Sequence, residues 1–301
     1  MAQLTASEGV SLKNILVATD FSAASVSALT SVVPIAREFH SVVHILHVIR
    51  PSETGLALTE TDEDILRETQ VDAQRQLTPL EDVLGSIPHK IWLREGNVCR
   101  AIADLVRSEQ IDLVVIGASG ESDFKKFVVG SAAEEIIRNA TCPVLCVGPH
   151  TSSSRTGLWL AQLLYVTSLW ETSHNGLRYA IKLASEYRSR LTLLHVVEQE
   201  PPGKPDREWL KGFRRIMRNL LPASAAKLHE KPQLRVEVTK NVAARILQVA
   251  DELRADVIVM DVQPADTMST HLRDKLYPII SWAHCPVLTV RTGEEQGSCE
   301  Q

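Results

Sequence analysis

Short apolar runs alternate along the chain with longer segments in which apolar residues recur at helical spacing. The runs in the first half are continuously apolar, which is typical of parallel strands that helices cover on both faces. They predict strands near residues 14–19, 42–49, 89–95, 112–117 and 143–148, and helices near 22–39, 61–84, 98–109 and 130–140. This alternation predicts an α/β fold with a doubly wound parallel sheet.

The same pattern occurs twice. The run Asn-Ile-Leu-Val-Ala-Thr-Asp that ends at Asp20 returns as Gln-Leu-Leu-Tyr-Val-Thr-Ser ending at Ser168, and Cys-Pro-Val-Leu occurs in both halves. The spacing from Ile15 to His47 is 32 residues, as is the spacing from Leu163 to His195. We therefore expect two domains in tandem, a duplication with a Ser/Thr-rich linker between the copies.

Length and composition limit what the chain can be. Its 301 residues suffice for two ordinary domains, which we place at residues 1–150 and 151–301. A net charge of −5 favours neither nucleic acid nor acidic membranes as a partner. The chain shows no secretory signal, no run long enough to cross a bilayer and no pair of cysteines at metal-ligand spacing. We expect a cytoplasmic protein without a metal site of its own.

A glycine pattern suggests an anion site in the first half. Gly117-Ala-Ser-Gly120 follows an apolar run, and Gly130-Ser131 opens a predicted helix after nine further residues. Glycines let a backbone approach a ligand closely, and the free amides of a helix N-terminus attract phosphate. Asp20 directly follows the first predicted strand. If the first and fourth strands are neighbours where the strand order reverses, Asp20 and Gly117 border the same crevice.

These segments together resemble the universal stress protein family in its tandem form. The resemblance rests on Ile-Leu-Val-Ala-Thr-Asp-Phe-Ser22, Leu46-His47-Val48, the G-x2-G-x9-G-S loop and Cys-Pro-Val-Leu, and it extends over nearly the whole chain. It implies a Rossmann-like sheet with strand order 3-2-1-4-5 in each domain. It also implies that the last strands of the two domains, residues 143–148 and 286–291, pair across a pseudo-twofold interface within the chain, and it leaves a homodimer open.

A subset of that family binds ATP through this glycine pattern, so the resemblance implies an ATP site, with Mg²⁺, in the first domain. The residues implied line one crevice and divide by the part of the nucleotide they would meet. They are Ala18, Thr19 and Asp20 for the ribose and adenosine, the backbone of Val48 for adenine, Gly117 and Gly120 for the ribose and α-phosphate, and Gly130, Ser131 and Ala132 for the β- and γ-phosphates.

The second half departs from this pattern. Ser168 stands in place of Asp20, Asp261 in place of Gly117 and Pro264 in place of Gly120, while Arg273-Asp274 replaces the last glycine and serine. An aspartate repels a polyphosphate, and a proline removes an amide donor. We expect this domain to keep the fold without a nucleotide.

Several alternatives stay open at this point. The glycine loop could be an ordinary connection, Asp20 could cap the helix that follows it, and Lys125 and Lys126 could either neutralise phosphate or lie in solvent. His47 and the equivalent His195 are expected to be core or strand-end histidines rather than catalytic ones. The chain offers no catalytic base, so we expect no enzyme beyond slow ATP hydrolysis.

The predicted function is therefore an ATP-binding stress-response sensor or regulatory module that holds nucleotide in its first domain only. The main alternative is a nucleotide-free scaffold that dimerises and docks protein partners. An adenylyl-transferring enzyme is a weaker alternative, because the turn after the first strand lacks a Ser-Gly-Gly loop. The predicted middle helix is acidic in the first half and basic in the second. The basic helix could mark an anionic surface or a partner, could be a solvated face over a core stripe, or could attract the acidic helix.

Overall fold

The computed structural model describes residues 10, 12–49, 60–118, 129–151, 160–169, 174–198, 207–262 and 275–291. The chain divides into two compact units, one formed by residues 11–149 and the other by residues 1–10 together with residues 150–301. Each unit contains one copy of the repeated pattern. Among the residues described, no helix is long and apolar enough to cross a membrane.

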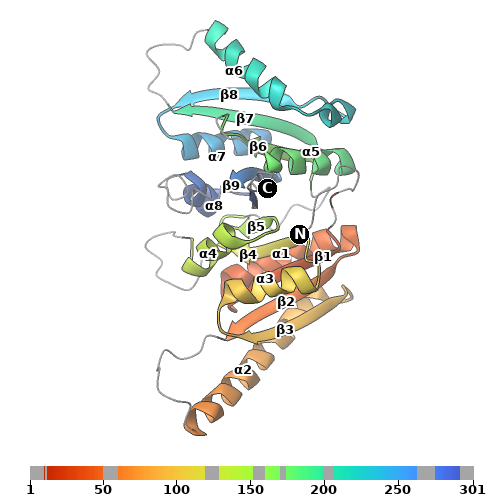
Figure 1. The fold of residues 1–301 in the computed structure, drawn as a ribbon, viewed down its shortest axis with the longest axis vertical. Helices are drawn as coiled ribbons and strands as arrows, with labels where there is room; N and C mark the ends of the chain where they lie inside the picture. Colours follow the sequence, from red (N-terminus) through yellow and green to blue (C-terminus); the bar gives the residue numbers. More distant parts are fainter. Residues whose placement is uncertain are drawn as a thin grey trace, which may run out of the picture. The chain divides into compact units, whose positions relative to one another are not determined.

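The first domain is built from alternating strands and helices (Figure 1). Its strands are β1 (Asn14–Thr19), β2 (Val42–Ile49), β3 (His89–Glu95), β4 (Leu113–Gly117) and β5 (Val144–Val147). Its helices are α1 (Ala23–Phe39), α2 (Glu60–Leu84), α3 (Val98–Ser108) and α4 (Ser131–Asn139). All neighbouring strands are parallel, in the order β3-β2-β1-β4-β5. The predicted fold and strand order are confirmed for this domain.

Helices cover both faces of this sheet. Successive residues of a strand point to opposite faces, and two adjacent residues of β3 show which helix covers which face. The Nε2 atom of His89 lies 3.5 Å from Glu81 of α2, whereas the Nζ atom of Lys90 lies 2.6 Å from Glu109 at the end of α3. Helices α1 and α2 pack together, as do α3 and α4. The sheet is therefore doubly wound, and its strand order reverses between β1 and β4.

The second domain repeats this arrangement. Its strands are β6 (Gln162–Val166), β7 (Arg190–Glu198), β8 (Gln233–Thr239), β9 (Val257–Val262) and β10 (Val287–Arg291). Its helices are α5 (Asn175–Tyr187), α6 (Arg207–Leu220), α7 (Val242–Leu253) and α8 (Tyr277–Trp282), with a 3₁₀ helix, η1 (Ala223–Lys227), after α6. The parallel order β8-β7-β6-β9-β10 corresponds to 3-2-1-4-5, so two domains of one fold lie in tandem along the chain.

Repeated polar residues fix the ends of these elements. Asn97 and Asn241 are the N-caps of α3 and α7, and each side chain accepts a hydrogen bond from the backbone N–H three residues later. The Oδ2 atom of Asp112 accepts from the backbone N–H of Asn14 at 2.9 Å, and Asp256 makes the equivalent contact in the second domain. These repeated motifs therefore define the architecture.

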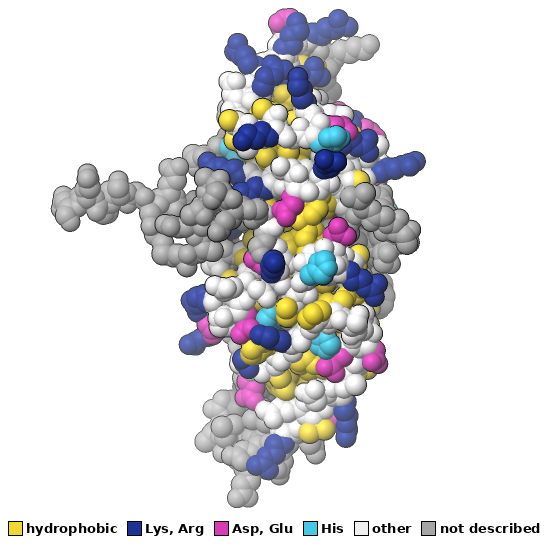
Figure 2. Space-filling view, turned by 90° about the vertical axis from the view of Figure 1, so that its right-hand side faces the viewer, with side chains coloured by type: hydrophobic (Ala, Val, Ile, Leu, Met, Phe, Trp, Pro, Cys, Tyr) yellow, Lys and Arg dark blue, Asp and Glu magenta, His cyan; other side chains and the backbone are white. Residues whose placement is uncertain are grey.

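Helix α6 shows how the charge of the second half is distributed. Met217 is buried, whereas Trp209 and Ile216 are partly exposed at the edge of the apolar stripe. Lys and Arg side chains gather over this part of the molecule in Figure 2, and the exposed basic residues of α6 are Arg207, Lys211, Arg214, Arg215 and Arg218. The basic face is exposed and lies over a core stripe, which agrees with the interpretation of a solvated face.

Candidate functional site

The carboxyl ends of β1 and β4 lie side by side in the first domain. Strands β1 and β4 pair in parallel from Ile15–Leu113 to Val17–Val115, so both continue toward the same edge of the sheet. Asp20 directly follows β1, and Gly117 ends β4. The two residues therefore lie at the same edge of the sheet, where the strand order reverses, which is the usual ligand position in open parallel sheets.

Asp20 offers an exposed carboxylate at this edge. Its Oδ1 atom accepts a hydrogen bond from the backbone N–H of Ser22 at 3.0 Å. Burial raises the pKa of Asp20, but hydrogen bonds from Ser22 and Ser25 outweigh burial, and the net effect is a pKa below the ordinary value. The N-cap of α1 is Ser22, whose hydroxyl accepts from the N–H of Ser25. The alternative in which Asp20 itself caps this helix is therefore wrong.

Thr19 supports the turn between β1 and α1. Its buried hydroxyl accepts from the N–H of Phe21 and lies 3.0 Å from the hydroxyl of Ser25. Phe21 has a positive φ of 64°, and its ring packs on His47 with centroids 4.3 Å apart. The Nδ1 atom of His47 lies 2.9 Å from the carbonyl oxygen of Thr19 and donates to it. His47 therefore joins β2 to the end of β1, the structural role expected for it.

Val48 and Ala18 occupy the neighbouring edge of the sheet. The last pair between β1 and β2 is Thr19 with His47, so Val48 lies one residue beyond the end of β1. Its position gives its backbone access to the space beyond β1. Ala18 is the penultimate residue of β1 and is half-buried.

Gly117 is required by the packing of α1. A Cβ atom at this position would lie 2.4 Å from the carbonyl carbon of Ala24 and 2.7 Å from the backbone nitrogen of Ser25. Backbone atoms cannot move aside as a flexible side chain can, so only glycine lets the first turn of α1 approach β4 this closely. The structure thus gives Gly117 a packing role in addition to the loop role that the resemblance implies.

The N-terminus of α4 opens close to the same edge. Gly130 is its N-cap and makes no side-chain cap; its own N–H donates to the carbonyl oxygen of Ala118 at 3.1 Å. The amides of Ser131 and Ala132 belong to the first turn, where helical N–H groups have no partner within the helix. These two amides and the Ser131 hydroxyl are the donors suited to a phosphate. Gly120, Lys125 and Lys126 lie outside the described residues.

At the corresponding edge of the second domain, side chains contact one another and the start of α5. Asp261, which stands in place of Gly117, accepts a hydrogen bond from the Tyr165 hydroxyl and another from the N–H of Gly176, each at 2.6 Å. The Nδ1 atom of His174 lies 3.4 Å from the same hydroxyl. Burial raises the pKa of Asp261 to about 6, although both hydrogen bonds lower it. Asp261 therefore accepts a hydrogen bond from the first turn of α5. Its alignment with Gly117 did not by itself predict this contact.

Sequence reasoning missed the supporting residues of both crevices. Phe21, Tyr165 and Gly176 match no motif of the glycine loop, and Ala118 contributes only its backbone. A signal for Tyr165 existed, since it is a polar-tipped residue in an otherwise apolar strand and needs a hydrogen-bond partner when buried. Pro264, Arg273 and Asp274 lie outside the described residues.

Comparison with known proteins places both halves in one family. A universal stress protein of Methanocaldococcus jannaschii is 31% identical over 139 residues, which are 45% of this chain and 81% of that protein. Universal stress protein YxiE of Bacillus subtilis is 29% identical over 144 residues, 44% of this chain and 96% of YxiE. Each relative thus matches about half of this chain.

Among solved structures, a universal stress protein from Archaeoglobus fulgidus matches 93% of this chain and 98% of its own, with a TM-score of 0.66 and 18% identity. A second match, a protein from Pseudomonas aeruginosa described as a putative universal stress protein, covers 93% of both chains with a TM-score of 0.54 and 16% identity. At these identities, both show likeness of fold. The model of the universal stress protein family matches residues 11–148 and again residues 162–291, so this chain belongs to that family as a tandem member.

Proposed function

We propose that the first domain binds ATP in the crevice between the carboxyl ends of β1 and β4, and that the second domain binds none. One observation carries the proposal: an ionised, exposed Asp20 and the open N-terminus of α4 both lie at the reversal of strand order. A carboxylate accepts hydrogen bonds from ribose hydroxyls, while helix amides attract phosphate. The family resemblance supports adenine as the base.

The contacts within this site must act together. Binding at about 1 μM corresponds to roughly −8 kcal/mol, whereas one helix terminus contributes only about 0.3–1 kcal/mol. The amides of Ser131 and Ala132, the carboxylate of Asp20 and burial of the adenine near Val48 each supply a part. When Mg²⁺ is bound, the phosphates would supply most of its ligands and the Ser131 hydroxyl could add one. The ion would offset the phosphate charge that a single helix terminus cannot balance.

The proposed role is that of a nucleotide-dependent regulatory module in a stress response, with ATP hydrolysis slow or absent. Fast hydrolysis needs a group that orients water and charges that stabilise the transferring phosphoryl group. Among the residues described around the crevice, Asp20 is bound to the turn by Ser22, and His47 donates to Thr19. Both side chains are thus engaged in the turn after β1, which supports slow or absent hydrolysis.

The test is isothermal titration of the full chain, stripped of nucleotide, with ATP and Mg²⁺. We expect one site per chain. Gly130→Val should weaken binding strongly, because a β-branched side chain then borders the phosphate amides. Asp20→Asn should weaken it by about tenfold through loss of charge-assisted hydrogen bonds. The matched control is Ser168→Asn, the same position in the second domain, which should leave binding unchanged.

Two equivalent sites, or no site, would contradict the proposal. The rival function, a nucleotide-free scaffold, gains support from the structural roles of two of the glycines: Gly117 is required by packing, and the Gly130 amide is bonded to Ala118. The scaffold gains further if acid extraction of freshly purified protein releases no nucleotide and titration finds no binding. The scaffold function is also supported if Gly130→Val abolishes ATP binding while function under stress is retained.

A further inference from the structure

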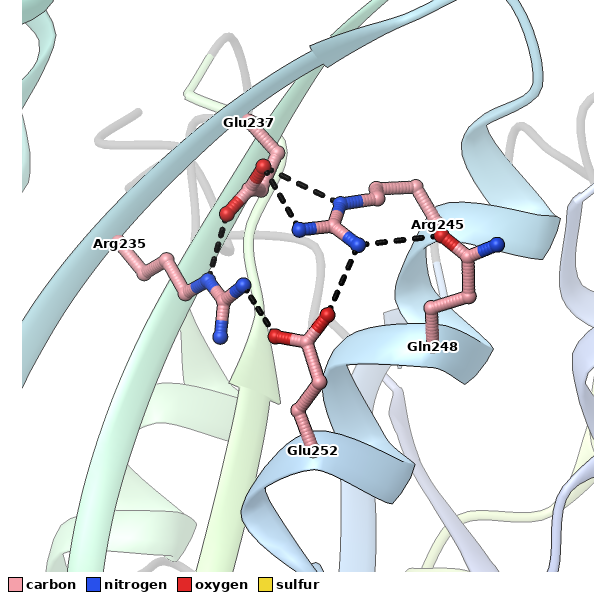
Figure 3. A network of polar contacts seen from close by, with 5 residues as sticks. All are labelled: Arg235, Glu237, Arg245, Gln248 and Glu252. Atoms are coloured by element: carbon pink, nitrogen blue, oxygen red, sulfur yellow. Dashed lines mark hydrogen bonds and ion pairs between the residues drawn. The ribbon is translucent and has the colours of Figure 1, made fainter.

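A network of ion pairs connects strand β8 to helix α7 in the second domain. Arg235 and Glu237 project from β8, and Arg245 and Glu252 project from α7 to meet them (Figure 3). The Nη2 atom of Arg245 lies 3.1 Å from Glu237, its Nη1 atom lies 3.0 Å from Glu252, and Gln248 accepts a further hydrogen bond at 3.0 Å. Every charge in this group faces an opposite one. The network fills the space between the helix and the edge strand of the sheet.

The register of the repeat shows which residues stand there in the first domain. Val48 and Val196 are equivalent, since each follows one of the two matching histidines. Val196 pairs with Glu237 and Val48 pairs with Arg94, so Arg94 occupies the position of Glu237. The N-caps Asn97 and Asn241 align the helices in the same way.

On this alignment, Ala101 takes the place of Arg245, and Ser108 takes the place of Glu252. The two long charged side chains that α7 contributes to the network have short counterparts on α3.

The first domain has a groove at this place. Its volume is about 370 Å³, within the range of about 300–1,000 Å³ that small-molecule sites occupy. The lining residues come from the end of β3 and from one face of α3 over its whole length: Arg94, Glu95, Gly96, Asn97, Arg100, Ala101, Asp104, Leu105 and Ser108. Ala101 and Leu105 are buried and form an apolar floor.

Two arginines of the groove keep free hydrogen-bonding capacity. Asp104 forms an ion pair with Arg107 at 2.6 Å, whereas Glu95 accepts from the neutral amide of Gln70 at 2.8 Å and keeps its negative charge. The two arginines therefore exceed the one carboxylate of the groove that has no cationic partner. Arg94 and Arg100 form no ion pair with any residue that the structure describes. Within the described part of the chain, Arg94 donates to the adjacent carbonyl of Leu93 alone, and it lies over the ring of Trp92, 4.9 Å from its centroid.

We propose that this groove binds a small organic oxyanion, either a phosphomonoester or a carboxylate, through Arg94 and Arg100. Guanidinium groups recognise both kinds of anion with paired hydrogen bonds. The apolar floor favours a ligand with a carbon body over a bare inorganic ion. The site is distinct from the proposed nucleotide crevice, because β3 is the edge strand and β2 separates it from β1.

The experiment uses the full chain with ¹⁵N-labelled arginine and follows the Nε signals by NMR. The probes are glycerol 2-phosphate and succinate, each titrated at constant ionic strength against sodium chloride. We expect saturable shifts for Arg94 and Arg100 with one or both probes, and the stronger probe identifies the class of anion. Arg235 and Arg245, which already face carboxylates, serve as internal references and should not shift. Backbone signals of Ser131 and Ala132 report separately on the nucleotide crevice.

Two variants test the assignment. Arg100→Gln removes one charge from an exposed side chain and should weaken binding by about tenfold or more. A triple variant, Arg94→Glu with Ala101→Arg and Ser108→Glu, places three of the four charges of the second domain's ion-pair network in the groove; Trp92 keeps the position of Arg235. The triple variant should fold and lose the saturable response. Uniform, non-saturating shifts of all exposed arginines, or binding that the triple variant retains, would overturn the proposal.

Discussion

The backbone N–H of Gly176 donates to the Oδ1 atom of Asp261 at 2.6 Å, and this contact explains how the two halves of the chain differ. The C-terminal ends of α1 and α5 align, since His40 and Arg188 are left-handed C-caps at equivalent positions. The start of α5 nevertheless lies about one turn later than that of α1. In the first domain that extra turn packs on Gly117; in the second, the Asp261 carboxylate accepts from the first turn of the shorter helix.

Ionisation of Asp261 should make the protein less stable as the pH rises. Its pKa is raised from 3.8 to about 6, so the fold favours the protonated carboxyl. The stability that this provides is fully present below about pH 4 and is lost as the pH rises through about 6. A shift of this size corresponds to about 3 kcal/mol. Urea unfolding followed from about pH 4.5 to 7.5 should show wild type losing stability relative to Asp261→Asn. Parallel curves for the two proteins would refute this.

The packing of Gly117 gives a second prediction. Gly117→Ala places a Cβ atom 2.4 Å from the backbone of Ala24, so α1 must move, and we expect a loss of about 3 kcal/mol. Gly212→Ala in α6 is the matched control: no atom lies within 4 Å of its added Cβ, and alanine favours a helix by about 1 kcal/mol. Thermal and urea unfolding should move in opposite directions for the two variants. A neutral Gly117→Ala would leave the loop role as the reason for this glycine.

The backbone architecture was predictable from the sequence, because apolar runs and helical spacing report burial directly. The strands at 14–19 and 42–49 illustrate this, since each is a run of mostly apolar residues that the sheet buries. The crevice residues were less predictable. Asp261 contacts Gly176 because α5 begins at Asn175. The residue at which a helix begins depends on tertiary packing, which a single sequence does not display.

His195 should impose the opposite pH dependence at lower pH. Burial lowers its pKa, and its bond to the Thr167 carbonyl at 3.0 Å only partly offsets this. A histidine held neutral in the fold loses its contribution as the pH falls below its unfolded value of 6.5. His195→Phe keeps an aromatic ring against Phe213 but removes both the titration and the hydrogen bond, at a cost of about 1–3 kcal/mol near neutral pH. Urea midpoints from about pH 5 to 7.5 should decline less steeply toward acid in the variant; an unchanged slope would contradict the assignment.

The ion-pair network between β8 and α7 should be worth more than isolated surface pairs. Glu237 faces both Arg235 and Arg245, and although burial raises its pKa, these partners lower it below the ordinary value. Glu237→Gln leaves two half-exposed guanidinium groups without this carboxylate, and we expect a loss of about 1–2 kcal/mol. Asp72→Asn, which breaks the exposed pair with Arg75, is the control and should cost less than about 0.5 kcal/mol. Urea unfolding at low and high salt separates the two variants, because both effects are electrostatic and the larger one should shrink visibly as salt screens it. Equal, salt-independent losses would show that the network acts by packing alone.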